Sequence, residues 1–300
     1  MKALLPEVYL QKWRLTYLNK NELQELRLRI GKPLILTYQG KEIIWKMGDD
    51  PIIITKIDLE RIFEWLCGYG VYAYQEEMKK GYITIQGGHR VGIGGQVSTS
   101  GDGQVIGIKY ISSILIRVSH DIHGIAKMIL KDIYENGRIQ NILILSPPGC
   151  GKTTLLRDLI RTVSNGNAYG EGLNVSVIDE RDELSAAYMG LPTLDLGNRT
   201  DVILGCDKAK GMEICLRALG PNVVAVDEIY NEKDFSSMKR LKGCGCSIIA
   251  THHASDYEEF SHKAFGMKLI REGIFDRYIV LGKEQGEFVV KNIVKSEDMG

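Results

Sequence analysis

The segment NILILSPPGCGKTTLLRDLIRTV, residues 141–163, predicts a buried strand, a glycine-rich loop and a helix in that order. Residues 142–145 form an unbroken apolar run, as in strands that are covered on both faces, and Pro147 and Pro148 prevent its continuation. An α/β fold with a mainly parallel sheet is therefore expected. After the loop, apolar residues recur at helical spacing and give the helix one face to bury: Leu155, Leu156, Leu159, Ile160 and Val163.

The loop in this segment has the composition of a nucleotide-phosphate site. Gly149 and Gly151 allow the backbone to approach a polyphosphate, so that N–H groups at the helix N-terminus face the phosphate oxygens. Lys152 supplies a cation for the β- and γ-phosphates, and Thr153 is placed to ligate a Mg²⁺ ion that bridges them. The usual pattern begins with glycine, but Ser146 occupies a position that turns the chain, where a small residue should serve. The residues expected around the phosphates are Pro148, Gly149, Cys150, Gly151, Lys152, Thr153 and Thr154.

Composition excludes several classes of protein. The 300 residues are 44% hydrophobic and 25% charged, which is typical of a globular protein and not of a disordered or fibrous one. Lys plus Arg and Asp plus Glu both number 38, so no overall positive charge directs the chain to nucleic acid, although a local basic patch remains an alternative. No window approaches 18 consecutive apolar residues, and Pro6 and Glu7 interrupt the N-terminus, so we expect a cytoplasmic location.

The first 135 residues predict a smaller α+β domain. Helical spacing is seen in residues 4–15 and in residues 21–30, where Leu23, Leu26 and Ile30 share one face. Polar residues and glycine at 130–138 then precede the strand of the phosphate loop, so we expect domains at 1–135 and 136–300. Further helices are expected at residues 58–68 and 72–80, and strands at 34–37, 42–45, 82–85, 90–93 and 114–118.

Within this first domain, the sequence GGHRVGIGGQV at residues 87–97 is rich in glycine. We interpret it as a hairpin whose glycines serve turns and bulges, in preference to the alternative of a ligand-binding loop. It lacks the strand, turn and helix that would surround a dinucleotide-binding fingerprint.

A run of acidic residues follows the second strand predicted in the C-terminal half. That strand covers residues 172–178, and the run DERDE occupies residues 179–183. Because ligands bind at the carboxyl ends of parallel strands, these side chains are candidates to order Mg²⁺ or water, and a solvated turn is the alternative. Residues 190–205 are expected to form a loop, and residues 212–219 a helix.

The sequence PNVVAVDE, residues 221–228, is the second strong motif. Its apolar strand, residues 223–226, delivers two carboxylates at its tip. Asp227 is expected to hold Mg²⁺ through the water shell of the ion, and Glu228 to polarise the water that attacks the γ-phosphate.

A fourth strand, residues 247–250, ends in three polar residues. Thr251, His252 and His253 can contact the γ-phosphate from this tip, but adjacent histidines on an extended chain point to opposite faces, so a shared metal ion is not expected. An amphipathic helix at residues 256–271 and a closing hairpin made by residues 277–281 and 287–294 complete the chain.

Several motifs together carry a resemblance to a known family. They are EEMKKGYITIQGGHRVGIGGQ (76–96), SPPGCGKTTLLRDL (146–159), IDERDEL (178–184), GNRTDV (197–202) and VVAVDEI (223–229). In this order they closely resemble the stage III sporulation protein AA family, including its serine at position 146. That family is similar to the traffic ATPases of type II and type IV secretion and of pilus assembly, in which a smaller N-terminal domain precedes a RecA-like motor. The resemblance therefore implies a RecA-like P-loop ATPase domain and a homo-hexameric ring.

The resemblance also implies roles for further residues. Glu183 matches the acidic box after the second strand, and His253 matches the histidine box. Arg199 and Arg217 are weaker matches for cations that stabilise the phosphates. Traffic ATPases commonly carry an arginine just after the second acidic motif, where this chain has residues 229–231, Ile-Tyr-Asn. Because a neighbouring subunit commonly supplies the arginine of such sites, Arg90 and Arg117 of the first domain are alternatives.

The function implied is a Mg²⁺-dependent ATPase, with ATP and Mg²⁺ as cofactors, in the mother cell of an endospore-forming bacterium. It would act at the membrane that faces the forespore, held there peripherally by membrane-embedded proteins of the same operon, while the first domain docks and rotates about residues 136–137. No direct contact with nucleic acid is expected. The alternatives are a RecA-like ATPase that acts on single-stranded nucleic acid and a nucleotide-gated scaffold without turnover.

Overall fold

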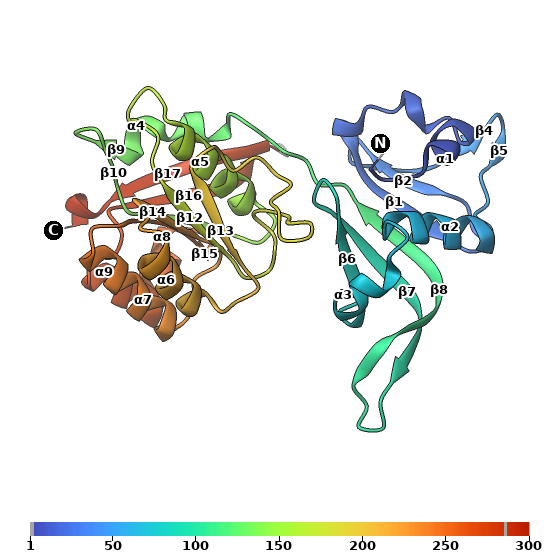
Figure 1. Ribbon diagram of the computed structural model, residues 1–300. Helices are drawn as coiled ribbons and strands as arrows, with labels where there is room; N and C mark the ends of the chain where they lie inside the picture. Colours follow the sequence, from blue (N-terminus) through green and yellow to red (C-terminus); the bar gives the residue numbers. More distant parts are fainter. Residues whose placement is uncertain (1–2, 285–286, 300) are drawn as a thin grey trace. The chain divides into compact units, whose positions relative to one another are not determined.

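The computed structural model describes residues 3–284 and 287–299 and divides the chain into two compact units (Figure 1). One unit comprises Met1–His120 with Ala186–Thr193, and the other comprises Asp121–Ser185 with Leu194–Gly300. No helix among the described residues is both long and apolar enough to cross a membrane.

The first unit is built on an antiparallel sheet of order β3-β2-β1-β8-β7-β6. Its core joins buried residues of β1, β2, β6, β7 and β8 to α1 and α2. The elements are α1 (Glu7–Lys12), η1 (Leu15–Tyr17), η2 (Lys20–Glu22), β1 (Leu23–Arg29), β2 (Ile35–Tyr38), β3 (Lys41–Ile44), β4 (Lys46–Met47), β5 (Asp50–Pro51), α2 (Lys56–Leu66), η3 (Val71–Tyr74), α3 (Gln75–Lys79), β6 (Tyr82–Ile85), β7 (His89–Thr99) and β8 (Val105–Arg117).

Strand β1 corrects the prediction of a helix at residues 21–30. Its Leu, Gln, Glu and Arg residues favour a helix locally, but Leu26 and Leu28 are both fully buried on the core face of a strand. β1 pairs with β2 on one side and with β8 on the other. The hydrogen bonds and burial gained from these distant strands outweigh the local preference.

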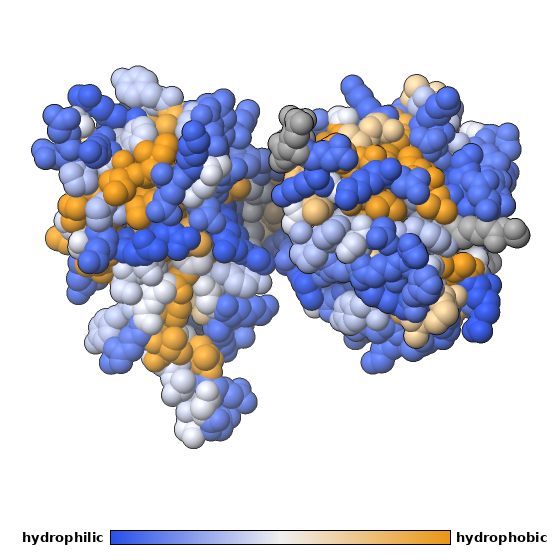
Figure 2. All heavy atoms as spheres, turned by 180° about the vertical axis from the view of Figure 1, so that it is seen from behind, coloured by the Kyte–Doolittle hydropathy of each residue, from blue (hydrophilic) through white to orange (hydrophobic). Residues whose placement is uncertain are grey.

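Strands β7 and β8 are longer than predicted and continue past β6 as a two-stranded arm. The register shifts between Gly94 and Gly95, where a Cβ on Gly95 would lie 1.9 Å from the Tyr110 carbonyl oxygen. The predicted hairpin with glycines at turns and bulges is thus confirmed. Hydrophobic residues lie along the arm in Figure 2, where Val97, Val105, Ile106 and Tyr110 are 41–58% exposed.

The boundary between the units lies between residues 120 and 121, and not between residues 135 and 136 as expected. The reason is that residues 126–139 pack in the core of the second unit. Ala126, Ile129 and Ile133 are fully buried in the core of the second unit. Asn136 and Gly137, expected as a hinge, form the turn between β9 and β10 inside that unit.

The second unit contains a seven-stranded sheet of order β13-β12-β14-β15-β11-β16-β17, parallel except for the last pair. β11 lies between β15 and β16. The elements are η4 (Ile125–Met128), α4 (Leu130–Ile133), β9 (Tyr134–Glu135), β10 (Arg138–Ile139), β11 (Ile142–Ser146), α5 (Lys152–Asn165), β12 (Val175–Asp179), β13 (Thr200–Leu204), α6 (Lys208–Ala218), β14 (Val223–Val226), α7 (Glu232–Gly243), β15 (Ser247–His253), α8 (Tyr257–His262), α9 (Ala264–Arg271), β16 (Arg277–Glu284), β17 (Glu287–Lys295) and η5 (Ser296–Met299).

Helices cover both faces of this sheet. The hydrophobic clusters place η4, α4 and α5 on one face and α6, α7, α8 and α9 on the other, as Figure 1 shows. Each central strand is buried on both faces, which explains the unbroken apolar runs at residues 142–145 and 223–226. The predicted α/β fold with a mainly parallel sheet is confirmed.

Two segments of the second unit differ from prediction. The expected loop at residues 190–205 contains β13, whose residues Thr200 to Leu204 pair in parallel with β12 at the sheet edge. The single helix expected at residues 256–271 is two helices, because Lys263 takes an extended conformation between α8 and α9. The closing hairpin is present as β16 and β17, and its turn at residues 285–286 lies outside the described residues.

Candidate nucleotide-phosphate site

The predicted phosphate loop joins the end of β11 to the start of α5. Gly149 and Gly151 have φ values of 71° and 82°, in the left-handed region that glycine adopts without strain. A cavity of about 420 Å³ opens beside the loop. It is lined by Pro148, Gly149, Gly151, Lys152, Thr153 and Thr154 of the loop and by Glu183, Glu228, His253 and Phe288 from elsewhere; Cys150, the remaining predicted loop residue, is half-buried and does not line it.

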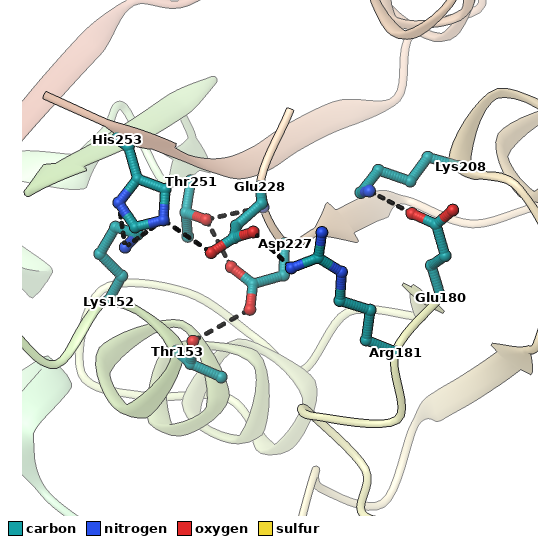
Figure 3. A network of polar contacts seen from close by, with 9 residues as sticks. All are labelled: Lys152, Thr153, Glu180, Arg181, Lys208, Asp227, Glu228, Thr251 and His253. Carbon is teal, nitrogen blue, oxygen red and sulfur yellow. Dashed lines mark hydrogen bonds and ion pairs between the residues drawn. The ribbon is translucent and has the colours of Figure 1, made fainter. Parts of the chain in front are cut away.

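Strand register explains why residues far apart in the sequence meet at this cavity. Ser146 at the end of β11 lies opposite His253 at the end of β15, and Val226 of β14 lies opposite Ala250. Because these strands are parallel, their carboxyl ends share one edge of the sheet. The polar residues that follow each strand therefore converge there (Figure 3).

Lys152, His253 and Glu228 form a chain of contacts across the cavity. The Lys152 Nζ lies 3.0 Å from His253 Nδ1, and His253 Nε2 lies 2.8 Å from Glu228 Oε1 (Figure 3). An ammonium group only donates and a carboxylate only accepts. A neutral His253 with its proton on Nε2 satisfies both neighbours, so the histidine links the loop lysine to the carboxylate.

Asp227 bridges two threonines. Its Oδ2 accepts a hydrogen bond from Thr153 Oγ1 at 3.0 Å, and its Oδ1 accepts one from the buried hydroxyl of Thr251. A threonine hydroxyl and a carboxylate at this separation are the protein ligands that a Mg²⁺ bound mainly by phosphates and water requires. Residues Thr153 and Asp227 thus fit the predicted metal site.

Glu228 has an unusual backbone conformation that aims its side chain into the cavity. Its φ of 54° lies in the left-handed region, which is uncommon for a residue with a side chain. The Glu228 N–H donates to Thr251 Oγ1 at 2.8 Å, and this bond holds the conformation. Thr251, predicted from the sequence to be able to contact the γ-phosphate, is fully buried and instead bonds to both Asp227 and Glu228.

The environment shifts the pKa values of two of these groups in directions that favour function. Partial burial opposes ionisation of Glu228, but its contacts with His253, Arg181 and Lys152 outweigh burial and hold the pKa of its carboxyl below the ordinary value. Burial lowers the pKa of Lys152, against the opposing effect of Asp227 and Glu228. Glu228 is thereby kept ionised as a potential base. Anionic phosphates would stabilise the charged form of Lys152, which burial disfavours.

The acidic run after β12 divides into structural and functional residues. The Asp179 carboxylate, which is 2% exposed, accepts hydrogen bonds from the N–H groups of Glu183, Leu184 and Ser185 and so folds the loop. Glu180 pairs with the buried Lys208. Glu183 is thus the member of the run that lines the phosphate cavity, as the resemblance implied.

Arg181 of the same run contacts the carboxylate of Glu228, a role that the sequence pattern did not predict. Its Nη1 lies 3.0 Å from Glu228 Oε2, so Glu228 lies between Arg181 and His253 (Figure 3). Arg181 follows the carboxyl end of β12, and this position in the fold is the signal that could have identified it.

Arg199 and Arg217 lie away from this cavity in their own subunit. Arg199 precedes β13, and its Nη1 donates to the Ser164 carbonyl at 3.3 Å, in the last turn of α5. Lys152 opens that helix, which places the two ends about 18 Å apart. Arg217 is exposed in the last turn of α6 and pairs with Glu213. Neither arginine can complete the site within one subunit.

The remaining candidates from the sequence, His252, Arg90 and Arg117, contact other groups. The His252 ring packs against Phe260 and Phe265 on the opposite side of β15 from His253, as expected for adjacent residues of a strand. In the first unit, Arg90 lies over the ring of Tyr82, and Arg117 pairs with Glu25.

Comparison with known proteins places this geometry in context. Residues 7–299 match the family described as sporulation stage III, protein AA. The stage III sporulation protein AA of Bacillus subtilis (strain 168) is 35% identical over 293 residues, which cover 98% of this chain and 91% of that protein. The resemblance seen in the motifs is confirmed.

Two solved structures share the fold at low identity. The pilus retraction motor PilT, solved with bound ADP, has a TM-score of 0.61 at 14% identity, covering 96% of this chain and 84% of its own. The ATPase DotB of Yersinia pseudotuberculosis has a TM-score of 0.62 at 12% identity, covering 98% of this chain and 81% of its own. The predicted RecA-like P-loop NTPase fold is confirmed by these similarities.

Proposed function

The chain belongs to the family of stage III sporulation protein AA, and from that premise and the site geometry we propose that it is a Mg²⁺-dependent ATPase. Its task is to power a transenvelope complex between mother cell and forespore. The observation that carries the proposal is that one cavity at the carboxyl edge of the sheet is lined by Lys152, Thr153, Glu228 and His253. Asp227 lies beside it and accepts a hydrogen bond from Thr153.

Binding of ATP would replace the contact between the side chains of Lys152 and His253. Lys152 lies 3.0 Å from His253 Nδ1, a neutral acceptor that phosphate oxygens would replace with much stronger charge-assisted bonds. The backbone N–H groups at the start of α5 and the Thr154 hydroxyl face the same space. His253, released from Lys152, can then respond to the γ-phosphate while it remains bound to Glu228.

Thr153 and Asp227 would hold Mg²⁺. When bound, the ion neutralises charge on the β- and γ-phosphates. Among residues 3–284 and 287–299, no cluster of three His, Cys, Asp or Glu side chains is arranged to bind a metal by itself. This suits an ion whose remaining ligands are phosphate and water oxygens.

Glu228 is the proposed general base. It accepts a proton from a water molecule while the oxygen of that water bonds to the γ-phosphorus and the bond from phosphorus to the ADP oxygen breaks. Arg181 and His253 hold the two carboxylate oxygens, which keeps Glu228 ionised and restricts its orientation. Glu183 lines the cavity beside it and is the second acidic residue available to order water.

We further propose a homo-hexameric ring in which a neighbouring subunit supplies an arginine. Such arginines contribute roughly 10³- to 10⁵-fold to turnover in related enzymes. Arg199 and Arg217 lie outside their own cavity and so remain candidates only in trans, with Arg90 and Arg117 as alternatives. Mixing Lys152→Ala subunits with subunits that lack the correct arginine should restore hydrolysis; if no pairing with the four arginines does so, the proposal of a trans arginine drawn from this set is wrong.

The first unit is the proposed docking domain, through which the chain associates peripherally with membrane-embedded proteins of its operon. Its support is the β7–β8 arm, since apolar side chains exposed in a row are unusual on a surface without a partner. We place the protein in the mother cell cytoplasm, at the membrane that faces the forespore, and expect no direct contact with nucleic acid.

Membrane fractionation of sporulating cells tests this function. The wild-type protein should sediment with membranes only when the other proteins of the operon are present. Ile106→Asp on the arm should abolish that association, whereas Met267→Asp, at a residue of equal exposure on α9, should not. Association without the partners would instead indicate direct lipid binding. Absence of association under every condition, with salt-dependent binding of single-stranded DNA, would favour the nucleic-acid alternative.

A further inference from the structure

Lys208 is a buried charged side chain that neither phosphate binding nor proton transfer uses. It is the first residue of α6 and is 4% exposed. A cation is disfavoured at this position for two reasons: burial removes its water, and the N-terminus of a helix carries a partial positive charge. The charge must therefore be compensated by specific partners, and the positions of these partners indicate what the side chain does.

The first partner of Lys208 lies in the loop after β12. Lys208 forms an ion pair with Glu180, the residue that precedes Arg181 (Figure 3). Glu180 points toward Lys208, whereas Arg181 points toward Glu228 and places its Nη1 3.0 Å from Oε2. The Arg181 side chain is 59% exposed, so neighbouring atoms do little to restrict it. The position of its backbone, which the adjacent ion pair holds, therefore decides whether it reaches Glu228.

The second partner of Lys208 lies in the loop after β14. The Nζ of Lys208 lies 4.9 Å from the centre of the Tyr230 ring, within the range of a cation–π contact. Tyr230 follows Glu228 by two residues, and its N–H donates to the buried carboxylate of Asp234 at 3.1 Å. Lys208 thus contacts both loops that supply the pair of Arg181 and Glu228.

We propose that Lys208 is a positioning residue for ATP hydrolysis, which holds the loops after β12 and β14 together so that Arg181 stays against Glu228; this inference rests on the proposed ATPase function. Lys208 does not line the phosphate cavity, so it acts through Arg181 and not on ATP itself. An exposed arginine has many rotamers. Holding it in place before ATP binds removes that entropic cost from the catalytic step.

Steady-state hydrolysis and equilibrium binding of full-length variants test the proposal. Lys208→Met removes the charge with little change in the length of the side chain, and should lower kcat by roughly 3- to 10-fold. Its affinity for Mg²⁺-ATP should stay within about twofold of the wild type, because the contacts of Lys152 with the phosphates are unchanged. Lys208→Arg keeps the charge and should restore part of kcat.

A double-mutant cycle with Arg181→Gln separates positioning from a merely structural role. In a chain that carries Arg181→Gln, the further change Lys208→Met should lower kcat less than about twofold, because the contact that Lys208 positions is already absent. A role of Lys208 in folding alone would instead lower kcat by the same factor with and without Arg181.

Glu180→Gln separates positioning from a direct effect of the Lys208 charge on the reaction. This variant removes a negative charge, whereas Lys208→Met removes a positive one, so an electrostatic effect alone would change kcat in opposite directions. Loss of either partner releases the loop, so positioning predicts a lower kcat in both variants. Because Glu180 is partly exposed, its variant tests the same ion pair even where Lys208→Met fails to fold.

Lys268 provides a matched control. It also pairs with a carboxylate, that of Glu232, and its Nζ lies 4.2 Å from the centre of the Phe235 ring. Lys268→Met should leave kcat within about twofold of the wild type.

Three results would overturn the positioning role in a chain that hydrolyses ATP. They are a wild-type kcat in both Lys208→Met and Glu180→Gln, opposite changes of kcat in these two variants, and an equal loss from Lys208→Met with and without Arg181. A wild-type chain that does not hydrolyse ATP would overturn the ATPase function and the positioning role with it.

Discussion

Both ends of the strands in the seven-stranded sheet carry charged residues that the sequence offered as candidates for the site, yet only the carboxyl edge has the geometry of a catalytic site. At the carboxyl edge, His253 lies within hydrogen-bonding distance of both Lys152 and Glu228. Asp227 accepts a hydrogen bond there from Thr153. At the amino edge, Arg199 and Arg217 are bound to local groups on α5 and α6. Motif membership alone therefore does not place a residue in the site.

The difference follows from how a parallel sheet is connected. The six parallel strands point their carboxyl ends toward the same edge, and loops that leave that edge lead into helix N-termini with unpaired N–H groups. Anions are favoured there, whereas the C-terminus of a helix favours cations such as Arg217 in the last turn of α6. The predictions that follow compare residues of the two edges or of one motif.

The largest effect is expected for the base at the carboxyl edge. Glu228→Gln should bind Mg²⁺-ATP with near-normal affinity while turnover falls roughly 10²- to 10⁴-fold, because the amide cannot accept the proton. Steady-state hydrolysis and equilibrium binding of the purified variant measure both quantities. Glu272→Gln, at a surface ion pair with Lys239, is the control and should turn over normally. Hydrolysis at the parental rate by Glu228→Gln would show that another group is the base.

The second prediction concerns stability and the buried side chain of Asp179, at the end of β12. Asp179→Ala removes the acceptor of the N–H groups of Leu184 and Ser185, and should cost about 2–4 kcal/mol in urea unfolding. Asp201→Ala, at an exposed position of β13, should change stability by less than about 0.5 kcal/mol. Equal stabilities would contradict the structural role of Asp179.

Arg181→Gln should lower turnover about tenfold or less at neutral pH and change its pH dependence. Glu228 has a pKa below its ordinary value, so the base is lost only when the pH falls through that lowered value. Removing the Arg181 charge raises the pKa, and the acid limb of the turnover profile should move to higher pH. Arg181→Lys should restore part of the shift. An unmoved acid limb would mean that Arg181 does not act through Glu228.

The smallest effect is expected at the amino edge. Arg199→Ala and Arg217→Ala should change the equilibrium affinity for Mg²⁺-ATP less than about twofold in isolated subunits, because neither side chain reaches the cavity. Fluorescent nucleotide titration measures this. A tenfold loss of affinity in either variant would remove the distinction between the two edges.

The parts of the molecule that could be predicted are those whose signals are local. The strand at residues 223–226 is recognisable from its apolar run, and the phosphate loop from its glycines. The order of the motifs then implies that Glu183 and His253 belong to the same site. Strand β1 could not be predicted, because its residues favour a helix until β2 and β8 pair with it. Arg181 and Phe288 reach the site through strand register and sheet order, which a linear pattern does not contain.

The central claim, that the carboxyl edge of the sheet is an ATP site, is tested most directly by calorimetric titration of Lys152→Ala with Mg²⁺-ATP. Lys152 faces the cavity from the first residue of α5, and loss of its charge-assisted bonds to phosphate should weaken binding at least tenfold. Lys239→Ala, which removes an exposed lysine of α7, should bind like the wild type. Equal affinities of wild type and Lys152→Ala would contradict the assignment of this edge as the nucleotide site.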